Sequence, residues 1–388
     1  MDFAERRNYL RKIFEYDKVI QLNDNKVRIL PFVFNENNDK KEIKRLSCLV
    51  PKGTEFCHES DSDIRENKNF SYSVFVPDER KVYKDCIILL HGLNERTWEK
   101  YLTWAEMLCK KTEKPVFLFP IAFHMNRTPV SWHTPRTSMP WVKLRKESSP
   151  QVSNSTFANV ALSLRLASSP LRLYTSGRET ILNLWQLVNQ IKDGRHPIME
   201  KNAGVDFFAY SIGAMISQIF LIGNPDQLLS DSKFFLFCGG SIFEEMNGSA
   251  REIMDNAAWN LVHEYYADHF GCIDGLNEDV IPDLNEDFLN RSFTSMLRTD
   301  MFTEFRNKFF DANKDRIRII TLKKDSVIPT HGVKLALGDN SKDILQELDF
   351  PFEYTHQNPF PKENEIITAG MLNNAFDNVF TSASAFLS

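Results

Sequence analysis

The chain has 388 residues, of which 42% are hydrophobic and 12% aromatic. A chain of this length and composition can bury a sizeable core, in one large domain or two medium ones, and is not expected to be disordered. Its 47 basic and 52 acidic residues nearly balance, which disfavours binding to nucleic acid or to an anionic membrane surface.

Three features bear on where the protein works. Residues Met1–Lys18 carry charges throughout, so we expect no secretory signal. No uninterrupted apolar stretch reaches the roughly 18–20 residues that span a bilayer, so we expect a soluble protein without membrane insertion. The cysteines form no C-x-x-C pair and no zinc-like group, which fits a reduced, cytoplasmic environment. They are Cys48, Cys57, Cys86, Cys109, Cys238 and Cys272.

Residues 1–70 are polar and mixed, and we interpret them as an N-terminal extension with edge strands. A helix-like pattern covers Tyr9–Phe14, and a strand is predicted at Val27–Phe34. A charged loop follows around Asn35–Lys44. Further strands are predicted at Leu46–Val50 and Ser71–Val76, giving an antiparallel edge.

Residues 71–388 form the main domain, in which apolar strands alternate with helices. Cys86–Leu90 (CIILL) is a run of consecutive apolar residues, typical of a parallel strand buried on both faces. The other strands of this kind are predicted at Val116–Pro120, Val205–Ala209, Phe234–Cys238 and Ile317–Leu322. Helices are predicted at Thr97–Lys110, Ser176–Lys192, from Ser211 onward, at Gly332–Leu348 and at Ala369–Phe380. The alternation predicts an α/β fold with a doubly wound, mostly parallel sheet and helices on both faces.

Two long segments interrupt this alternation. Residues 122–173 are rich in Ser, Pro, Arg and Trp, and residues 241–315 are helix-prone. Both follow the carboxyl ends of predicted strands, which is the side of an open parallel sheet where ligands bind. We therefore expect 122–173 to be a substrate loop and 241–315 a helical cap or lid.

The segment Val205–Ala214 (VDFFAYSIGA) places Ser211 between a buried strand and the start of a helix. A sharp strand-to-helix turn strains its middle residue and leaves no room for bulky neighbours two positions away, and Ala209 and Gly213 satisfy that demand. The chain here resembles the α/β-hydrolase superfamily, whose nucleophile elbow reads G-x-S-x-G, with Ala209 in place of the first glycine. The alternative is a serine that merely caps a core helix.

A second motif of the resemblance is Leu89–Asn94 (LLHGLN). In the superfamily a strand that ends in His-Gly lines the oxyanion hole, where two backbone N–H groups stabilise the negative oxygen of acyl transfer. The resemblance implies that these donors are Leu93, or Gly92, together with Ile212. The alternative is a glycine that only ends a strand.

The resemblance also implies the partners of the serine. Asp325 follows a buried strand by three residues and precedes Val-Ile-Pro, as in the acid loop of the superfamily. His356 ends a strand-like segment, Phe352–His356, and completes the chain order Ser, Asp, His. Asp325 would orient the imidazole and His356 would act as the base. An aspartate in a tight turn and a solvated histidine are the alternatives, and His331 competes with His356.

Other patterns do not support a cofactor or a metal. His263 and His269 are six residues apart, whereas a zinc-protease helix needs two histidines four apart on one face. Cys272 nearby leaves a weak, opportunistic site conceivable. Neither a phosphate loop nor a dinucleotide-binding glycine motif is present. We therefore expect no nucleotide cofactor and no resident metal.

Five residues are candidates for substrate contacts. His91 and Tyr210 adjoin the two motifs, and Glu244 follows a strand end. Trp132 and Arg136 lie in an aromatic and arginine-rich stretch that extends to residue 145 and could grip an aromatic or carboxylate group. The alternative for that stretch is that it holds the loop to its own domain.

The resemblance covers roughly residues 70–388 and implies a two-step acyl transfer through an acyl-enzyme on Ser211. A small-molecule ester is the expected substrate, because esters need the least help at the leaving group, while thioesters and amides stay open. A hydrolase-like protein that has lost turnover and serves as a binding or scaffold module is the alternative. The oligomeric state and the individual substrate stay open as well.

Overall fold

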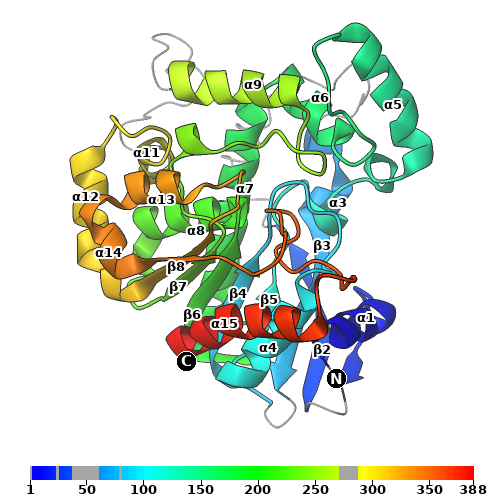
Figure 1. Cartoon of the computed structure of the whole chain (residues 1–388). Coiled ribbons are helices and arrows are strands. Elements are labelled where there is room, and N and C mark those ends of the chain that lie inside the picture. Colours follow the sequence, from blue (N-terminus) through cyan, green and yellow to red (C-terminus); the bar gives the residue numbers. More distant parts are fainter. Residues whose placement is uncertain (1, 23–25, 37–60, 78–80, 271–286) are drawn as a thin grey trace.

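The computed structural model describes residues 2–22, 26–36, 61–77, 81–270 and 287–388. Within them one sheet of nine strands forms the centre of the molecule (Figure 1). In spatial order the strands are β1 (Ile20–Leu22), β2 (Val27–Asn35), β3 (Asn69–Pro77), β5 (Val116–Leu118), β4 (Tyr83–Leu90), β6 (Met199–Tyr210), β7 (Phe234–Phe237), β8 (Ile317–Leu322) and β9 (Leu345–Leu348).

The sheet is mixed and mostly parallel. Strands β1, β2 and β3 pair antiparallel with one another, and β3 pairs antiparallel with β5. All pairs from β5 through β4, β6, β7 and β8 to β9 are parallel. With helices on both faces, this arrangement is the α/β-hydrolase fold and confirms the predicted fold class.

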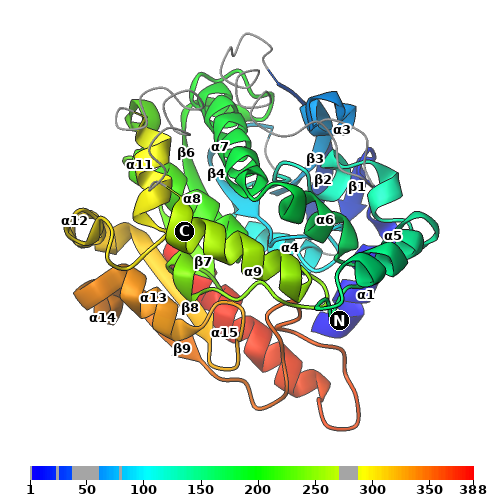
Figure 2. The ribbon, with the colours of Figure 1, turned by 90° about the horizontal axis from the view of Figure 1, so that it is seen from above.

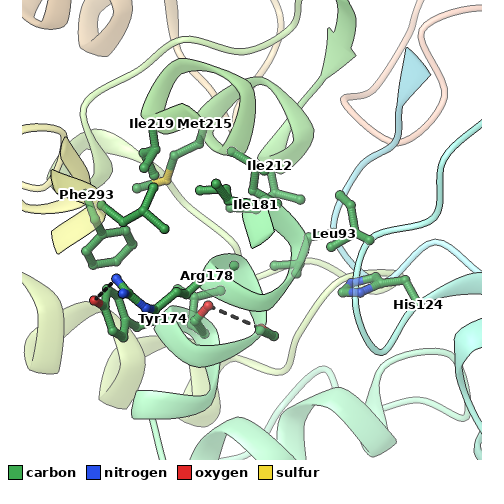
Figure 3. Close-up of a pocket in the computed structure, with 15 residues that line it drawn as sticks. Leu93, His124, Tyr174, Arg178, Ile181, Ile212, Met215, Ile219 and Phe293 are labelled. Atoms are coloured by element: carbon green, nitrogen blue, oxygen red, sulfur yellow. Dashed lines mark hydrogen bonds between the residues drawn. The ribbon is translucent and has the colours of Figure 1, made fainter. Parts of the chain in front are cut away.

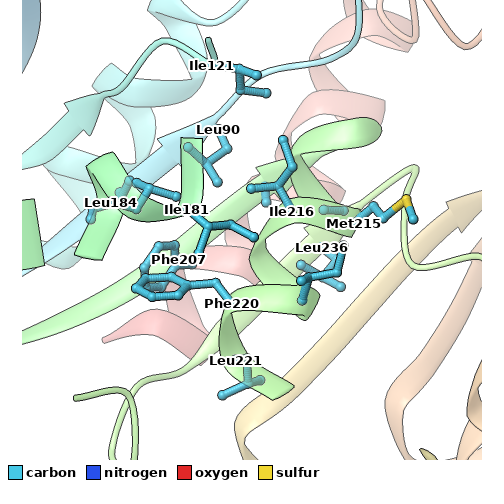
Figure 4. Close-up of a cluster of buried hydrophobic side chains, with 14 of the residues drawn as sticks. Leu90, Ile121, Ile181, Leu184, Phe207, Met215, Ile216, Phe220, Leu221 and Leu236 are labelled. Atoms are coloured by element: carbon cyan, nitrogen blue, oxygen red, sulfur yellow. The ribbon is translucent and has the colours of Figure 1, made fainter. Parts of the chain in front are cut away.

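Consecutive side chains of the central strands supply both faces of the sheet. In β4, Ile87 and Leu89 belong to one buried cluster, whereas Ile88 and Leu90 belong to the other, as the two-residue period of a strand requires. The first cluster lies under α1 (Phe3–Ile13), α4 (Leu102–Thr112) and α15 (Ala369–Leu387). Figure 4 shows the second cluster, which lies under α7 (Leu171–Lys192) and α8 (Ile212–Gly223). Burial on both faces explains the uninterrupted apolar runs.

Most of the remaining helices lie in the two long inserts or between β8 and β9 in the chain. Residues 122–173 hold α5 (Pro135–Ser148) and α6 (Val160–Ser168). Residues 241–315 hold α9 (Asn256–Glu264), a π-helical turn at Tyr265–His269, α11 (Phe288–Ser295) and α12 (Thr303–Asn313). Short helices α3 (Arg65–Lys68), α13 (Thr330–Leu337) and α14 (Ser341–Ile344) complete the set. Among the helices that the structure describes, none is long and apolar enough to cross a membrane.

The two inserts contact each other directly. Figure 2 shows α5, α6 and α9 side by side. The guanidinium of Arg145 on α5 holds both carboxylate oxygens of Asp255 at 3.0 and 3.1 Å, and Asp255 also caps the start of α9. The backbone N–H of Asp255 donates to Ser163 Oγ on α6 at 2.9 Å. A buried, doubly hydrogen-bonded ion pair of this kind fixes the relative position of the two segments.

Several predicted boundaries were wrong. Leu345–Leu348 is the edge strand β9, not the end of a helix, because it pairs with β8 on one side only and leaves Gln346 and Glu347 exposed. Helix α4 begins at Leu102 and not at Thr97, since Trp98 and Tyr101 form a buried turn before it. Residues 352–356 form no strand. The predicted strand at 46–50 and most of the charged loop before it lie outside the described residues.

Candidate active site

Ser211 is the single residue between the end of β6 and the start of α8. Its backbone angles are φ 57° and ψ −124°, a sparsely populated conformation that costs a non-glycine residue of order 1–3 kcal/mol. The close approach of β4 explains the glycine two positions later: a Cβ at Gly213 would lie 2.7 Å from the carbonyl oxygen of His91. The turn is therefore as sharp as the small residues around Ser211 led us to expect.

A continuous hydrogen-bond chain begins at the Ser211 hydroxyl. Ser211 Oγ lies 2.7 Å from His356 Nε2, and His356 Nδ1 lies 2.7 Å from Asp325 Oδ2. The other oxygen of Asp325 accepts the N–H groups of Val327 and Ile328, each at 2.9 Å. Because the carboxylate is acceptor-only, Nδ1 carries the proton and Nε2 is free to accept from the serine.

Burial and stacking hold His356 in place, since its segment has no regular secondary structure. The side chains of His356 and Asp325 are 2% and 0% exposed. The Tyr210 hydroxyl donates to the His356 carbonyl, and the two rings stack with centroids 5.4 Å apart. Tyr354 Oη accepts the Lys324 N–H at 3.0 Å and so links the histidine segment to the acid loop. The imidazole is thus positioned from both sides.

The backbone N–H groups of Leu93 and Ile212 lie near Ser211 and have no acceptor among the described residues. Gly92 is different, because its N–H donates to the Tyr101 hydroxyl at 2.9 Å. The Gly92 N–H is therefore already paired, whereas the Leu93 N–H is not. Tyr101 in turn donates to Glu95 Oε1 at 3.0 Å, which fixes the acceptor orientation of the phenol.

A cleft of about 320 Å³ opens at this site. Its wall mixes charged and apolar groups from the segment after β4, the two inserts and the His356 segment. The lining residues are Gly92, Leu93, Asn94, Glu95, Arg96, Thr97, Ala158, Tyr210, Ser211, Glu252, Ile253, His356 and Gln357. The serine hydroxyl is therefore reachable from a solvent-connected space although the residue itself is 4% exposed.

Comparison of the sequence with protein families assigns the chain. The model of the family described as "Family of unknown function (DUF6051)" matches residues 1–388. The chain belongs to DUF6051. No curated protein matches its sequence significantly.

Solved structures similar to this DUF6051 chain include several esterases. Carboxyl esterase 2 (TmelEST2) from the mycorrhizal fungus Tuber melanosporum is 9% identical, with 99% of this chain and 96% of that chain covered and a TM-score of 0.42. A novel cold-adapted esterase from an Arctic intertidal metagenomic library is 12% identical, with coverages of 96% and 98% and a TM-score of 0.39.

Of the five residues predicted to contact substrate, only Tyr210 lines the cleft. The His91 ring is fully buried: its Nδ1 donates to the Gly92 carbonyl at 2.8 Å, and its Nε2 accepts the Ile121 N–H at 3.0 Å. Burial lowers the pKa of His91 well below its usual value, so it is a neutral support of the loop after β4. Trp132 and Arg136 do not line the cleft of the DUF6051 protein, since Trp132 packs under Arg165 and Arg136 is exposed.

Glu244, the fifth substrate candidate, and His331 do not line the cleft. The carboxylate of Glu244 accepts the Thr299 N–H, and its carbonyl accepts from His263 Nε2 at 2.8 Å, so it holds the second insert together. His331, the competitor of His356, is exposed on α13. Cys272, which belongs to the histidine pattern considered for a metal, lies outside the described residues.

The role of Tyr101 could not be predicted from the sequence, because a tyrosine in an apolar helix pattern gives no sign that its hydroxyl accepts a hydrogen bond from a backbone N–H group.

Proposed function

We propose that this DUF6051 protein is a serine hydrolase that cleaves a carboxylic ester through an acyl-enzyme on Ser211. The observation that carries the proposal is the unbroken chain from Ser211 Oγ through the His356 ring to Asp325, with both hydrogen bonds at 2.7 Å. A hydroxyl, an imidazole and a buried carboxylate in this order and geometry are what nucleophilic acyl transfer needs.

The first step forms the acyl-enzyme. Ser211 Oγ attacks the substrate carbonyl carbon while its proton moves to His356 Nε2, and the carbonyl oxygen becomes negative. The free N–H groups of Leu93 and Ile212 then donate to that oxygen. When the tetrahedral intermediate collapses, the bond to the leaving alcohol breaks and the alcohol takes the proton from His356.

The second step releases the acid and restores the enzyme. A water molecule gives its proton to His356 Nε2 and attacks the acyl carbon, and the bond to Ser211 Oγ breaks as the serine takes the proton back. Asp325 orients the imidazole and stabilises the imidazolium in both steps, and two backbone N–H groups hold its second oxygen in place.

The two inserts support this function as a joint cap over the cleft. Asn94 Nδ2 donates to the carbonyls of Ala158 and Glu252, each at 2.7 Å, and these residues come from different inserts. The Arg145–Asp255 ion pair joins the same inserts at a distance from the cleft. We propose that residues 122–173 and 241–315 together set which substrates reach Ser211.

A fluorophosphonate probe tests the nucleophile. The wild-type protein is expected to be labelled at pH values from about 6 to 9, and Ser211→Ala is expected to abolish labelling. Ser217→Ala is the matched control, since Ser217 is an equally buried serine on α8 whose hydroxyl bonds within the helix; it should label like wild type. Absence of labelling throughout that pH range would favour the scaffold alternative.

A further inference from the structure

A second, apolar pocket shares the residue Leu93 with the cleft. Leu93 lines both spaces, and Ile212, the residue after the nucleophile, lines the pocket. Figure 3 shows how side chains of α7, α8 and α11 converge on it, among them Ile181, Met215 and Phe293. The pocket therefore begins at the two residues whose N–H groups would hold the substrate carbonyl oxygen.

The size and lining of this pocket restrict what it can take. Its volume of about 30 Å³ is about two to three times the roughly 10–15 Å³ that one water molecule requires on the same measure. The wall is mostly aliphatic and aromatic, and the guanidinium of Arg178, which also lines it, is paired with Asp287. A short hydrocarbon chain of a few atoms fits such a space, whereas a long or charged group does not.

His124 is a polar side chain of the wall with an unused hydrogen-bonding atom. His124 is 5% exposed and its Nδ1 donates to the Ala122 carbonyl at 2.9 Å. Its Nε2 is buried and, among the described residues, has no hydrogen-bond partner. Leaving such an atom unpaired is unfavourable, so a hydrogen bond supplied by a ligand would stabilise the complex.

The protonation state of His124 defines the missing partner. Burial lowers the pKa of His124 to about 4, the hydrogen bond to Ala122 opposes this, and nearby Arg127 and Arg165 lower it further. The neighbouring His91 ring, 5.4 Å away, is neutral as well. With the proton on Nδ1, the neutral ring presents Nε2 as an acceptor. Only a ligand group that donates a hydrogen bond can pair with it.

We propose that this pocket binds the acyl group of the substrate and that His124 Nε2 accepts a hydrogen bond from a donor on that acyl group. The inference rests on the proposed function. His124 lies at the same end of the pocket as Leu93 (Figure 3), so the donor belongs near the ester carbonyl. The substrate class is thus an ester of a short hydroxy acid, with the hydroxyl group a few bonds from the carbonyl carbon.

The test compares two probe esters, p-nitrophenyl butyrate and p-nitrophenyl 3-hydroxybutyrate. The wild-type protein is expected to favour the hydroxy ester in kcat/KM by about tenfold, the effect of one buried hydrogen bond. His124→Asn keeps a donor for Ala122 but loses the Nε2 acceptor, so the ratio should fall to about 1. His124→Gln places an amide oxygen near the Nε2 position and should keep most of the preference.

His196→Asn is the matched control, because His196 is a buried histidine outside the pocket whose Nε2 bonds Tyr72; its ratio should equal that of wild type. Equal kcat/KM for both esters in the wild-type protein, or a preference that survives in His124→Asn, would overturn the inference while the hydrolase function stands. If Ser211-dependent hydrolysis of both esters is absent, the proposed function and this inference fail together.

Discussion

Replacing Asp325 with asparagine should disable the site while leaving it almost unchanged in shape. Oδ1 of Asp325 accepts two backbone N–H groups, from Val327 and Ile328, and Oδ2 faces His356 Nδ1. An asparagine must keep its oxygen toward the two N–H groups, because its NH₂ group would otherwise oppose them. The NH₂ group then faces His356 and forces the ring to accept at Nδ1 and to carry its proton on Nε2.

A histidine protonated on Nε2 cannot take the proton of Ser211. In hydrolases with the same constellation this tautomer change lowers kcat by about 10⁴-fold, which corresponds to roughly 5 kcal/mol at about 1.4 kcal/mol per tenfold. The size of the effect follows from the two N–H groups on Oδ1, since they remove the freedom of the asparagine to rotate.

The assay is kcat/KM for a p-nitrophenyl ester together with the rate of fluorophosphonate labelling, each measured beside the urea midpoint of unfolding. Asp325→Asn should lose about 10⁴-fold in both rates, while its free energy of unfolding changes by about 1–3 kcal/mol at most. A variant that folds and retains activity within about tenfold of wild type would refute the role assigned to Asp325.

Three further predictions follow from strain, charge and pH. Ser211→Gly should be more stable to urea than Ser211→Ala by about 1 kcal/mol, because glycine adopts φ 57° without strain; equal stability would contradict the strained turn. Asp255→Ala leaves the Arg145 guanidinium without its carboxylate and should lower the unfolding free energy by about 3–5 kcal/mol; a loss below about 1 kcal/mol would show that the inserts are held by other contacts. Burial raises the pKa of Glu179 from 4.5 to about 7 against the opposing effect of Arg127. Between these two pH values the folded state keeps a proton on Glu179 that the unfolded state has released. The free energy of unfolding should therefore fall as the pH rises from 4.5 to about 7. Glu179→Gln should flatten this part of the pH profile, and an unchanged slope in urea melts would refute the assignment.

The sequence predicts strands correctly where both faces of the strand are buried. Strands β4, β6, β7 and β8 are covered on both faces, so their apolar runs stand out against any helical or alternating pattern. Edge strand β9 has no such signal, because its sequence LQEL does not alternate in polarity and its two central residues are polar and exposed. Residues 352–356 are held by aromatic packing instead of strand pairing, which a short apolar segment cannot reveal.

The residues of the candidate site also fall into those that the sequence could predict and those that it could not. Ser211, Asp325 and His356 each follow a recognisable element, so their residue types and order could be predicted together. The choice between Gly92 and Leu93 could not, since it depends on where the hydroxyl of Tyr101 lies in space. Contacts that connect distant segments leave no pattern within any one of them.

The central claim is that Ser211 carries the acyl group during turnover. Acid quenching of the protein during hydrolysis of p-nitrophenyl butyrate, followed by peptide mass spectrometry, tests it most directly. We expect a butyryl mass increase on the peptide that contains Ser211, and no such increase in Ser211→Ala. Hydrolysis that proceeds with no acylated peptide, or with the acyl group on another residue, would contradict it.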